Sequence, residues 1–404
     1  MKHLEIIFNA LKGCFITLFL ATVTPMAAQQ DSLRMDSVEI SLLTCQPHDE
    51  VYSLYGHTAI RYHDLRKDGI DIAFNYGIFD FKKSFFVLRF VFGLTDYELG
   101  AYPYHFFQEE YRRFGSMVTE QVLNLTDEEK AVLQQALAVN MKSENRVYRY
   151  NYFYNNCTTK ARDIIEKCIT GKIEYESRDD YAPTFREMVH EMTRDNPWAR
   201  FGNDLLLGIK ADSKTTMRQQ EFLPYNLMYD FDHAQIYLYG QYRPLVKERR
   251  IAVPAGVRMV KSEIPLTPLE CMVILLGIGL ILFLIEWKKQ RAFVVWDVLL
   301  MLITGIIGIV LFLMLFSQHP TVSLNLQFIL LNPLPLFFLW QVLNSKRTRY
   351  WHITAVLCVL FLIGGLFQSY AEGIWSLALC LLLQSILHLK VKNEKSKVKR
   401  NNEK

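Results

Sequence analysis

The stretch at residues 146–171, RVYRYNYFYNNCTTKARDIIEKCITG, contains the change of period that decides the fold. Aromatic and polar side chains alternate through its first half, 146–154, and a period of two residues predicts a strand. Gly171 supplies a helix stop. The sequence therefore predicts a strand that passes into the N-terminus of a helix, with Cys157 at the junction. The helix is indicated by apolar side chains at helical spacing, at Ile164, Ile165, Cys168 and Ile169.

A cysteine at such a junction has the surroundings of a reactive thiol. Unpaired amide N–H groups and the positive end of the helix dipole favour the thiolate over the thiol. The same amides are placed to hold a developing oxyanion. We therefore expect Cys157 to be the nucleophile, with a base supplied from elsewhere in the chain.

The base that we expect is His57, in the stretch YSLYGHTAIRYHD. The alternation in this stretch predicts a strand, residues 64–69 a turn, and residues 70–77 the returning strand. Folding this hairpin brings Asn75 or Tyr76 roughly opposite His57. Asn75 is our candidate for the residue that orients the imidazole, as the third member of a Cys-His-Asn arrangement does.

The other histidines are weaker candidates for the base. His63 shares the strand parity of His57 and is its strongest competitor, whereas three more are expected at the surface: His105, His190 and His233. His and Cys do not cluster at metal-ligand spacing, so neither a metal nor another cofactor is expected. The chain has no Gly-x-Ser-x-Gly elbow and no sustained basic patch interleaved with stacking rings, which argues against nucleic acid.

Three motifs in this order carry a family resemblance. GHTAIRY at 56–62, FNYGIFDF at 74–81 and NNCTTKARD at 155–163 together resemble the Bacteroides-type lipoprotein N-acyltransferases. A histidine that precedes the cysteine also resembles circularly permuted papain-like folds, such as lecithin:retinol acyltransferase relatives and NlpC/P60-like hydrolases. The resemblance covers most of the chain, and it implies Cys157 as nucleophile and His57 as base. It implies an α+β, permuted papain-like domain followed by an all-α membrane domain.

The start of the chain predicts export. Lys2 and Lys12 precede the apolar run CFITLFLATV, and the sequence Met26-Ala-Ala28 follows. This pattern predicts a signal peptide, residues 1–28, cut near Ala28; the alternative is an uncleaved anchor. In both cases the domain that follows is exported to the periplasm.

The exported domain contains three cysteines, Cys45, Cys157 and Cys168. Either Cys45 and Cys168 form a disulfide that leaves Cys157 free, or all three are unpaired and Cys168 is buried on its helix. Both arrangements leave a thiol at the predicted nucleophile.

Several further segments are predicted as scaffold. Residues 38–44 indicate a strand, a capping box at Thr126 begins a helix that runs to about Met141, and residues 179–194 contain another helix. The phenylalanine-rich stretch 79–92 forms either a core of large rings or a channel for acyl chains. Basic residues before the membrane either meet phosphate headgroups or belong to a solvated linker: Lys247, Arg249, Arg250, Arg258 and Lys261.

The last third of the chain predicts a membrane domain, residues 267–389, that follows a linker at 255–266. It has five apolar stretches, each near the roughly 20 residues that a bilayer requires. Lys and Arg occur in the first and third loops and in the tail at 390–404, whereas the second and fourth loops have none. The positive-inside rule then places the domain at 29–254 in the periplasm. The five stretches are 267–285, 294–316, 322–343, 353–370 and 374–389.

A thiolate with a histidine base performs acyl transfer. Our first hypothesis is an inner-membrane acyltransferase in which Cys157 takes an acyl chain from a membrane phospholipid and passes it to the α-amine of a diacylglyceryl-cysteine lipoprotein. The second is a membrane-tethered NlpC/P60-like cysteine peptidase or amidase that acts on cell-wall peptides. The third is a binding or transport module in which Cys157 is structural.

Overall fold

The computed structural model describes residues 35–48, 50–79, 84–178, 180–257, 264–344 and 349–402. The predicted signal peptide, Arg258 and Lys261 lie outside the described residues. The chain divides into two compact units, which we call the sheet unit and the helical unit. The sheet unit takes its described residues from Met1–Lys83, Asp96–Tyr181 and Thr216–Lys261, and the helical unit takes them from Ser84–Thr95, Ala182–Thr215 and Ser262–Lys404.

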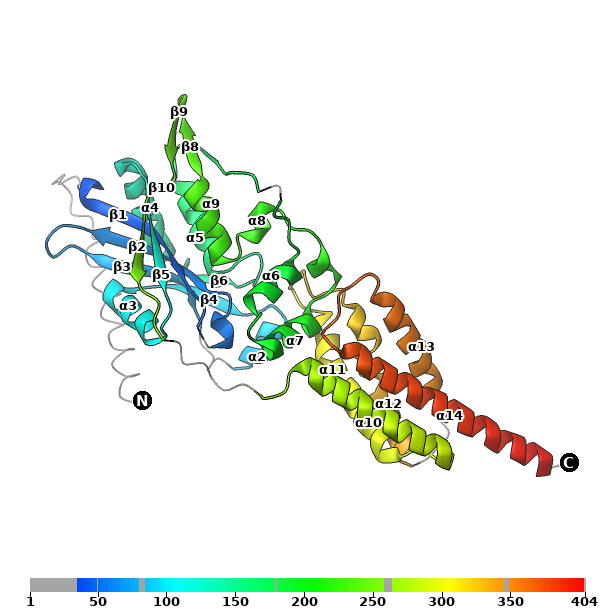
Figure 1. Cartoon of the computed structure of the whole chain (residues 1–404). Coiled ribbons are helices and arrows are strands. Elements are labelled where there is room, and N and C mark those ends of the chain that lie inside the picture. The colour runs from blue at the N-terminus through cyan, green and yellow to red at the C-terminus, as the bar shows by residue number, and fades with distance from the viewer. Residues whose placement is uncertain are drawn as a thin grey trace, which may run out of the picture. The chain divides into compact units, whose positions relative to one another are not determined.

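The sheet unit is a mixed α/β domain, as predicted (Figure 1). Its main sheet has seven strands in the order β10-β5-β1-β2-β3-β4-β6, and every neighbouring pair is antiparallel. These strands are β1 (Val38–Cys45), β2 (His57–Asp64), β3 (Asp71–Ile78), β4 (Asp96–Pro103), β5 (Val118–Leu123), β6 (Val147–Arg149) and β10 (Val246–Val253). A smaller sheet pairs β7 (Lys172–Glu174), β8 (Gln235–Leu238) and β9 (Gln241–Pro244).

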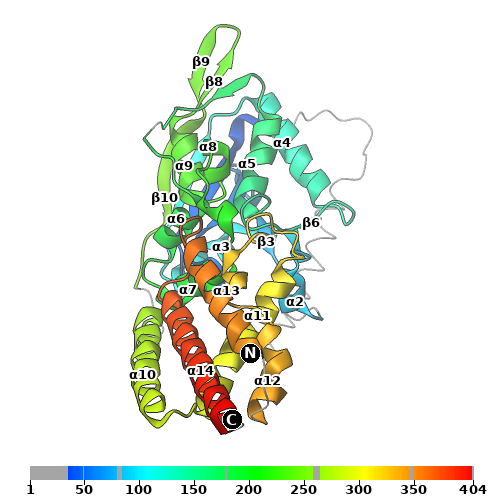
Figure 2. The ribbon, with the colours of Figure 1, turned by 90° about the vertical axis from the view of Figure 1, so that its right-hand side faces the viewer.

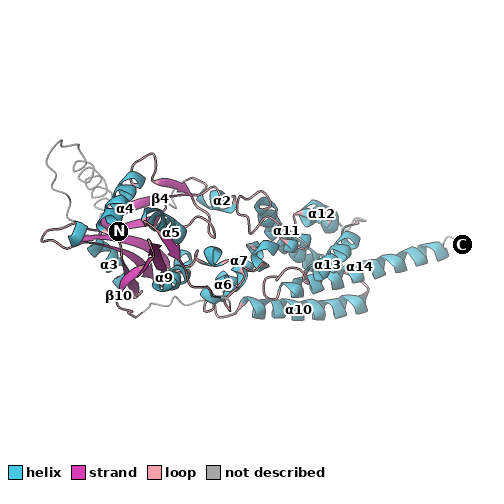
Figure 3. Cartoon of the chain, turned by 90° about the horizontal axis from the view of Figure 1, so that it is seen from above, coloured by secondary structure: helices cyan, strands magenta, loops and turns pink. Residues whose placement is uncertain are grey.

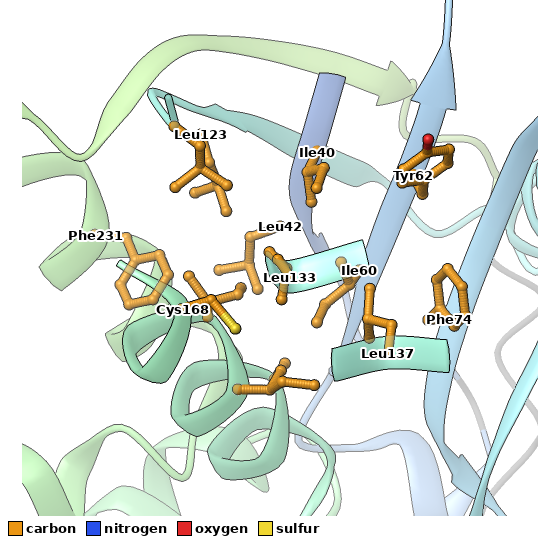
Figure 4. Close-up of a cluster of buried hydrophobic side chains, with 14 of the residues drawn as sticks. Ile40, Leu42, Ile60, Tyr62, Phe74, Leu123, Leu133, Leu137, Cys168 and Phe231 are labelled. Carbon is orange, nitrogen blue, oxygen red and sulfur yellow. The ribbon is translucent and has the colours of Figure 1, made fainter. Parts of the chain in front are cut away.

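Helices cover both faces of the main sheet. On one face α4 (Asp127–Asn140), α5 (Cys157–Cys168) and α9 (Pro224–His233) bury a hydrophobic cluster (Figure 4). On the other face α3 (Tyr104–Arg113) packs against a second cluster (Figure 3). Leu42 and Leu43 of β1 belong to different clusters, because successive strand residues point to opposite faces. The first cluster includes Ile40, Leu42, Ile60, Tyr62, Phe74, Leu133, Leu137, Cys168 and Phe231.

Several sequence predictions agree with these elements. The hairpin that begins at His57 is present as β2 and β3, and Thr126 caps α4 through a capping box with Glu129. The strand predicted at 146–154 is wrong beyond Arg149, because the chain turns where Asn151 and Asn155 pair with each other.

The region from residue 222 to 253 has regular secondary structure, although it contains Pro224 and Pro244. It forms α9, β8, β9 and β10, and β10 completes the main sheet against β5. Arg249 pairs with Asp232 at 3.0 Å, and Arg250 pairs with Glu39 at 2.8 Å and Glu120 at 3.0 Å. The linker interpretation is therefore wrong for Arg249 and Arg250, which lie on β10 and are ion-paired within the sheet unit.

The helical unit contains the predicted membrane domain (Figure 2). Three of its helical ranges are long and apolar enough to cross a membrane: Pro268–Lys289, Val294–Met314 and Leu326–Leu343. Two apolar helices are shorter, Tyr350–Gly364 and Ile374–Lys390. Its helices here are α10 (Pro268–Lys289), α11 (Val294–Met314), α12 (Leu334–Leu343), α13 (Tyr350–Gly364) and α14 (Ile374–Asn402), so most of the predicted tail is helical.

Segments that precede residue 215 also belong to the helical unit. These are α2 (Phe86–Val91), α6 (Phe185–Met192) and α7 (Pro197–Leu206). Phe201 of α7 is buried in one cluster with Trp296 and Leu300 of α11. The backbone carbonyl of Phe92, after α2, accepts a hydrogen bond from Gln318 N–H at 3.0 Å. Three apolar side chains beside and on α2 are exposed, which disagrees with a core of rings: Phe85, Leu88 and Phe90.

Candidate functional site

Cys157 is the first residue of α5, as predicted. Asn156 caps the helix: its side-chain oxygen accepts hydrogen bonds from the amides of Thr158 and Thr159, each at 3.0 Å. Asn156 is itself buried, and its amide nitrogen donates to the carbonyls of Tyr152 and Phe222. The cap thus uses two of the first-turn amides that the sequence suggested for an oxyanion, and leaves the amide of Cys157 itself for that role.

His57 begins β2, and its imidazole is held by Asn75 of β3. His57 Nε2 lies 2.8 Å from Asn75 Oδ1, which also accepts a hydrogen bond from the Gly77 amide at 2.7 Å. Asn75 Nδ2 donates to the hydroxyl of Tyr102 at 3.2 Å. Because Asn75 Oδ1 can only accept, His57 carries a proton on Nε2, and Nδ1 is the ring nitrogen left for another partner.

That partner is the thiol of Cys157. His57 and the backbone N–H of Thr58 both act on the sulfur and lower the pKa of the thiol, and Cys157 in turn raises the pKa of His57. Thr58 Oγ1 and Thr158 Oγ1 are hydrogen-bonded at 3.1 Å, which ties the start of β2 to the start of α5. The structure therefore brings together the three residues singled out from the sequence: Cys157, His57 and Asn75.

Gly77 makes room for the imidazole. The β2–β3 register pairs Ile60 with Phe74, and its continuation places Gly77, rather than Asn75, opposite His57. A Cβ atom at Gly77 would lie 2.6 Å from His57 Cε1 and 3.0 Å from Asn75 Oδ1. A side chain at this position would therefore displace the ring from the thiol.

The electrostatics of the pair favour its charged form. Burial raises the pKa of the Cys157 thiol, but the charge of His57 and hydrogen bonds from His57 and Thr58 outweigh burial and lower it to about 7. Burial lowers the pKa of His57, but the charge and hydrogen bond of Cys157 and the hydrogen bond of Asn75 raise it above its ordinary value. Near neutral pH, thiolate and imidazolium therefore stabilise each other.

Four tyrosines line this site, and we call them the tyrosine wall. The pKa of each of four tyrosines is raised, first by burial and also by the charge of the Cys157 thiolate: Tyr97, Tyr148, Tyr150 and Tyr152. Tyr97 stacks on Tyr150 with 4.0 Å between ring centroids, and Phe79 stacks on Tyr97 at 4.8 Å. Tyr154, which the alternation over 146–154 would place on the same side of a strand as these tyrosines, is exposed because the strand ends at Arg149.

The remaining candidates lie elsewhere. His63 is six residues along β2, about 20 Å from His57 at 3.3 Å per residue, and it lies 3.9 Å from Asp71. His190 bonds Asp204 at 2.8 Å in the helical unit, His105 packs on Phe106, and His233 stacks on Tyr229. None of these contacts leads to Cys157.

The exported cysteines are all free among the described residues. Cys45 pairs with His57 in the β1–β2 register but is buried in the cluster under α3, whereas Cys168 is buried under α5 on the opposite face. The disulfide alternative is therefore wrong. Burial raises the pKa of Cys45, which keeps it a neutral thiol beside the reactive one.

Sequence reasoning missed the residues that support the site. Tyr102 lies on a separate strand, and nothing in the sequence pairs it with Asn75. Gly77 was detectable, because a glycine opposite a catalytic candidate in a predicted hairpin signals a close approach.

Two domain models of one protein family match this chain, one in its N-terminal part and one in its C-terminal part. The family model for the Lnb N-terminal periplasmic domain matches residues 25–191. The model for the Lnb transmembrane domain matches residues 260–396. No curated protein and no solved structure matches the chain.

Proposed function

The chain belongs to the Lnb family of lipoprotein N-acyltransferases, inner-membrane proteins with a periplasmic N-terminal domain, and from this premise we propose its reaction. The protein transfers a fatty acyl chain from a membrane phospholipid, through a thioester on Cys157, to the α-amine of a diacylglyceryl-cysteine lipoprotein. The observation that supports this reaction best is His57, which is hydrogen-bonded to Asn75 and whose charge lowers the pKa of the Cys157 thiol.

In the first half-reaction, His57 Nδ1 holds the proton of the thiol and Cys157 Sγ attacks the ester carbonyl of the phospholipid. The amide of Cys157 stabilises the oxyanion. The C–O bond then breaks, His57 returns its proton to the leaving glycerol oxygen, and a lysophospholipid departs. The acyl chain stays on the sulfur as a thioester.

In the second half-reaction the α-amine of the lipoprotein attacks the thioester. An α-amino group has a pKa of about 8, so a useful fraction is neutral near pH 7. The amine forms the amide, the thiolate leaves, and His57 takes up the proton that the nitrogen loses. The tyrosine wall excludes water, which would otherwise hydrolyse the thioester.

The proposal also includes a permuted papain-like arrangement of the periplasmic domain and five membrane spans. A histidine on β2 that precedes a cysteine at the start of α5 supports a circularly permuted papain-like order. The two shorter apolar helices, added to the three long ranges, support five spans, with the domain boundaries predicted above. An odd number of spans agrees with a periplasmic site and a cytoplasmic C-terminus.

The direct test of this reaction is substitution of Cys157. We expect Cys157→Ala and Cys157→Ser to remain in the membrane and to produce no triacylated lipoprotein, whereas Cys271→Ser, a partly buried cysteine of α10, keeps full activity. Mass spectrometry of the lipoprotein N-terminus provides the measurement. Incubation of wild-type protein with phospholipid should also give an acyl group on Cys157 that hydroxylamine releases. Full acylation by Cys157→Ala would refute the proposal.

A further inference from the structure

Lys160 lies one turn after Cys157 on α5. Residues three apart on a helix are neighbours, with Cβ atoms roughly 5–6 Å apart. The Lys160 ammonium lies over the ring of Tyr148, 5.0 Å from its centroid. Tyr148 belongs to the tyrosine wall around the Cys157 thiol, and its hydroxyl donates to the carbonyl of Tyr76. A partly buried cation is therefore held at the edge of the site.

This cation has no carboxylate partner among the described residues, which sets it apart from its basic neighbours. Arg162, on the same helix, pairs with Asp163 and Glu221, each at 2.8 Å. Arg149, near Tyr148 in sequence, pairs with Asp96 at 2.7 Å. An unneutralised, partly buried ammonium attracts an anion more strongly than a solvated one, because the local dielectric is lower.

We propose that Lys160 binds the phosphate of the phospholipid donor and so positions the donor's ester beside Cys157; this role rests on the acyl transfer proposed above. The phosphate and the acyl esters of a glycerophospholipid are a few bonds apart on the glycerol backbone. That separation is comparable with the roughly 5–6 Å between Cβ atoms of residues three apart on a helix. Lysine recognises phosphate as a point charge, which suits a headgroup that must leave after the first half-reaction.

The inference predicts that Lys160 discriminates between donors. The variant Lys160→Met keeps the length of the side chain and removes its charge, and Lys160→Arg keeps the charge. Loading of Cys157 is measured by intact mass with phosphatidylethanolamine and with a diacylglycerol that has the same acyl chains and no phosphate. Lys167→Met, an exposed lysine on the same helix, is the matched control.

We expect Lys160→Met to lower kcat/KM for loading from phosphatidylethanolamine about tenfold to a hundredfold, the effect of losing one charged hydrogen bond. Loading from diacylglycerol, alkylation of Cys157 by iodoacetamide and transfer of a preloaded acyl group should be unchanged. Lys160→Arg should retain most of the loading from phosphatidylethanolamine, and Lys167→Met all of it.

Two results would overturn the role of Lys160 and leave the acyl transfer standing: an equal loss with both donors in Lys160→Met, or no loss with either. Wild-type protein that neither donor loads would overturn the acyl transfer itself, and the phosphate role with it. The donor comparison in the wild-type protein therefore separates the two failures.

Discussion

At the scale of single residues, the reactivity of Cys157 is a balance between burial and its neighbours. Burial alone would leave the thiol protonated, and the imidazolium of His57 is the largest contribution in the opposite direction. Asn75 fixes which nitrogen of His57 faces the sulfur, and Tyr102 fixes Asn75. Tyr102 and Asn75 therefore stabilise the ion pair indirectly, by holding the imidazole of His57 in position.

The pH dependence of alkylation follows from this balance. Because the thiolate is the nucleophile, the iodoacetamide rate at Cys157 should rise with pH around a midpoint near 7. In His57→Ala, burial still raises the pKa of Cys157, but the charge of His57 that lowers it is gone. The midpoint should therefore move above the ordinary thiol value of about 8.5. Peptide mass spectrometry at Cys157 measures both rates. Equal midpoints in the two proteins would exclude the ion pair.

A second prediction at this scale concerns Gly77. Gly77→Ala should displace the imidazole and lower the rate of acyl loading at least tenfold, since general base catalysis contributes about 10²–10⁴-fold. The control is Gly202→Ala in α7, where an added Cβ meets nothing within 4 Å. Loading measured by intact mass should fall only in the first variant. Normal loading by Gly77→Ala would contradict the claim that a Cβ atom at this position displaces the His57 imidazole.

At the scale of elements, α2 connects the site to the membrane domain through the chain. It follows β3, which contains Asn75, and precedes β4, which contains Tyr97 and Tyr102. Its own contacts are with the helical unit: His319 Nε2 lies 3.2 Å from the carbonyl oxygen of Phe90. His319 follows α11 in a loop that has no Lys or Arg, which the positive-inside rule places on the periplasmic side.

The exposed rings of α2 should therefore contact lipid of the periplasmic leaflet. A benzoylphenylalanine photocrosslinker in place of Phe85, which is 78 % exposed, should capture phospholipid. The same group in place of Tyr239, which is 94 % exposed in the β8–β9 turn and shares the left-handed backbone of Phe85, should not. Mass spectrometry of the adducts gives the comparison. Equal lipid capture at both positions, or crosslinks from Phe85 to a second protein chain, would contradict the assignment.

At the scale of the whole molecule, the two units are interleaved along the chain. Residues 182–215 lie before the last strand of the sheet unit in sequence, yet they belong to the helical unit. The amide of Gly208 donates to the carbonyl of Thr321 at 2.8 Å, and the side chain of Gln368 donates to the carbonyl of Leu207 at 3.1 Å. A cut between the predicted domains therefore removes the partners of α7 and of the residues that follow it.

Truncation should show this dependence. A chain that ends at residue 261 leaves Phe201 and its apolar neighbours on α7 without the cluster that buries them, and we expect it to aggregate or to require detergent. Size-exclusion chromatography without detergent provides the measurement. A monodisperse, active fragment that cleaves a cell-wall peptide would instead favour the membrane-tethered peptidase.

The sequence by itself determined the features that depend on neighbouring residues. The change of period at Cys157 predicted the start of α5, the alternation around His57 predicted the β2–β3 hairpin, and the loop charges predicted the orientation in the membrane. These features follow from local backbone geometry and from the bilayer, so a short window of sequence contains the information. The resemblance of three motifs identified the family, which the two family models confirm.

The tertiary structure alone decided which distant residues meet. The contact of Tyr102 with Asn75 and the position of Lys160 over Tyr148 each join separate elements. The assignment of α2, α6 and α7 to the helical unit is of the same kind. Such contacts depend on how whole elements pack, because the side chains involved lie on different strands or helices, and no local pattern constrains them.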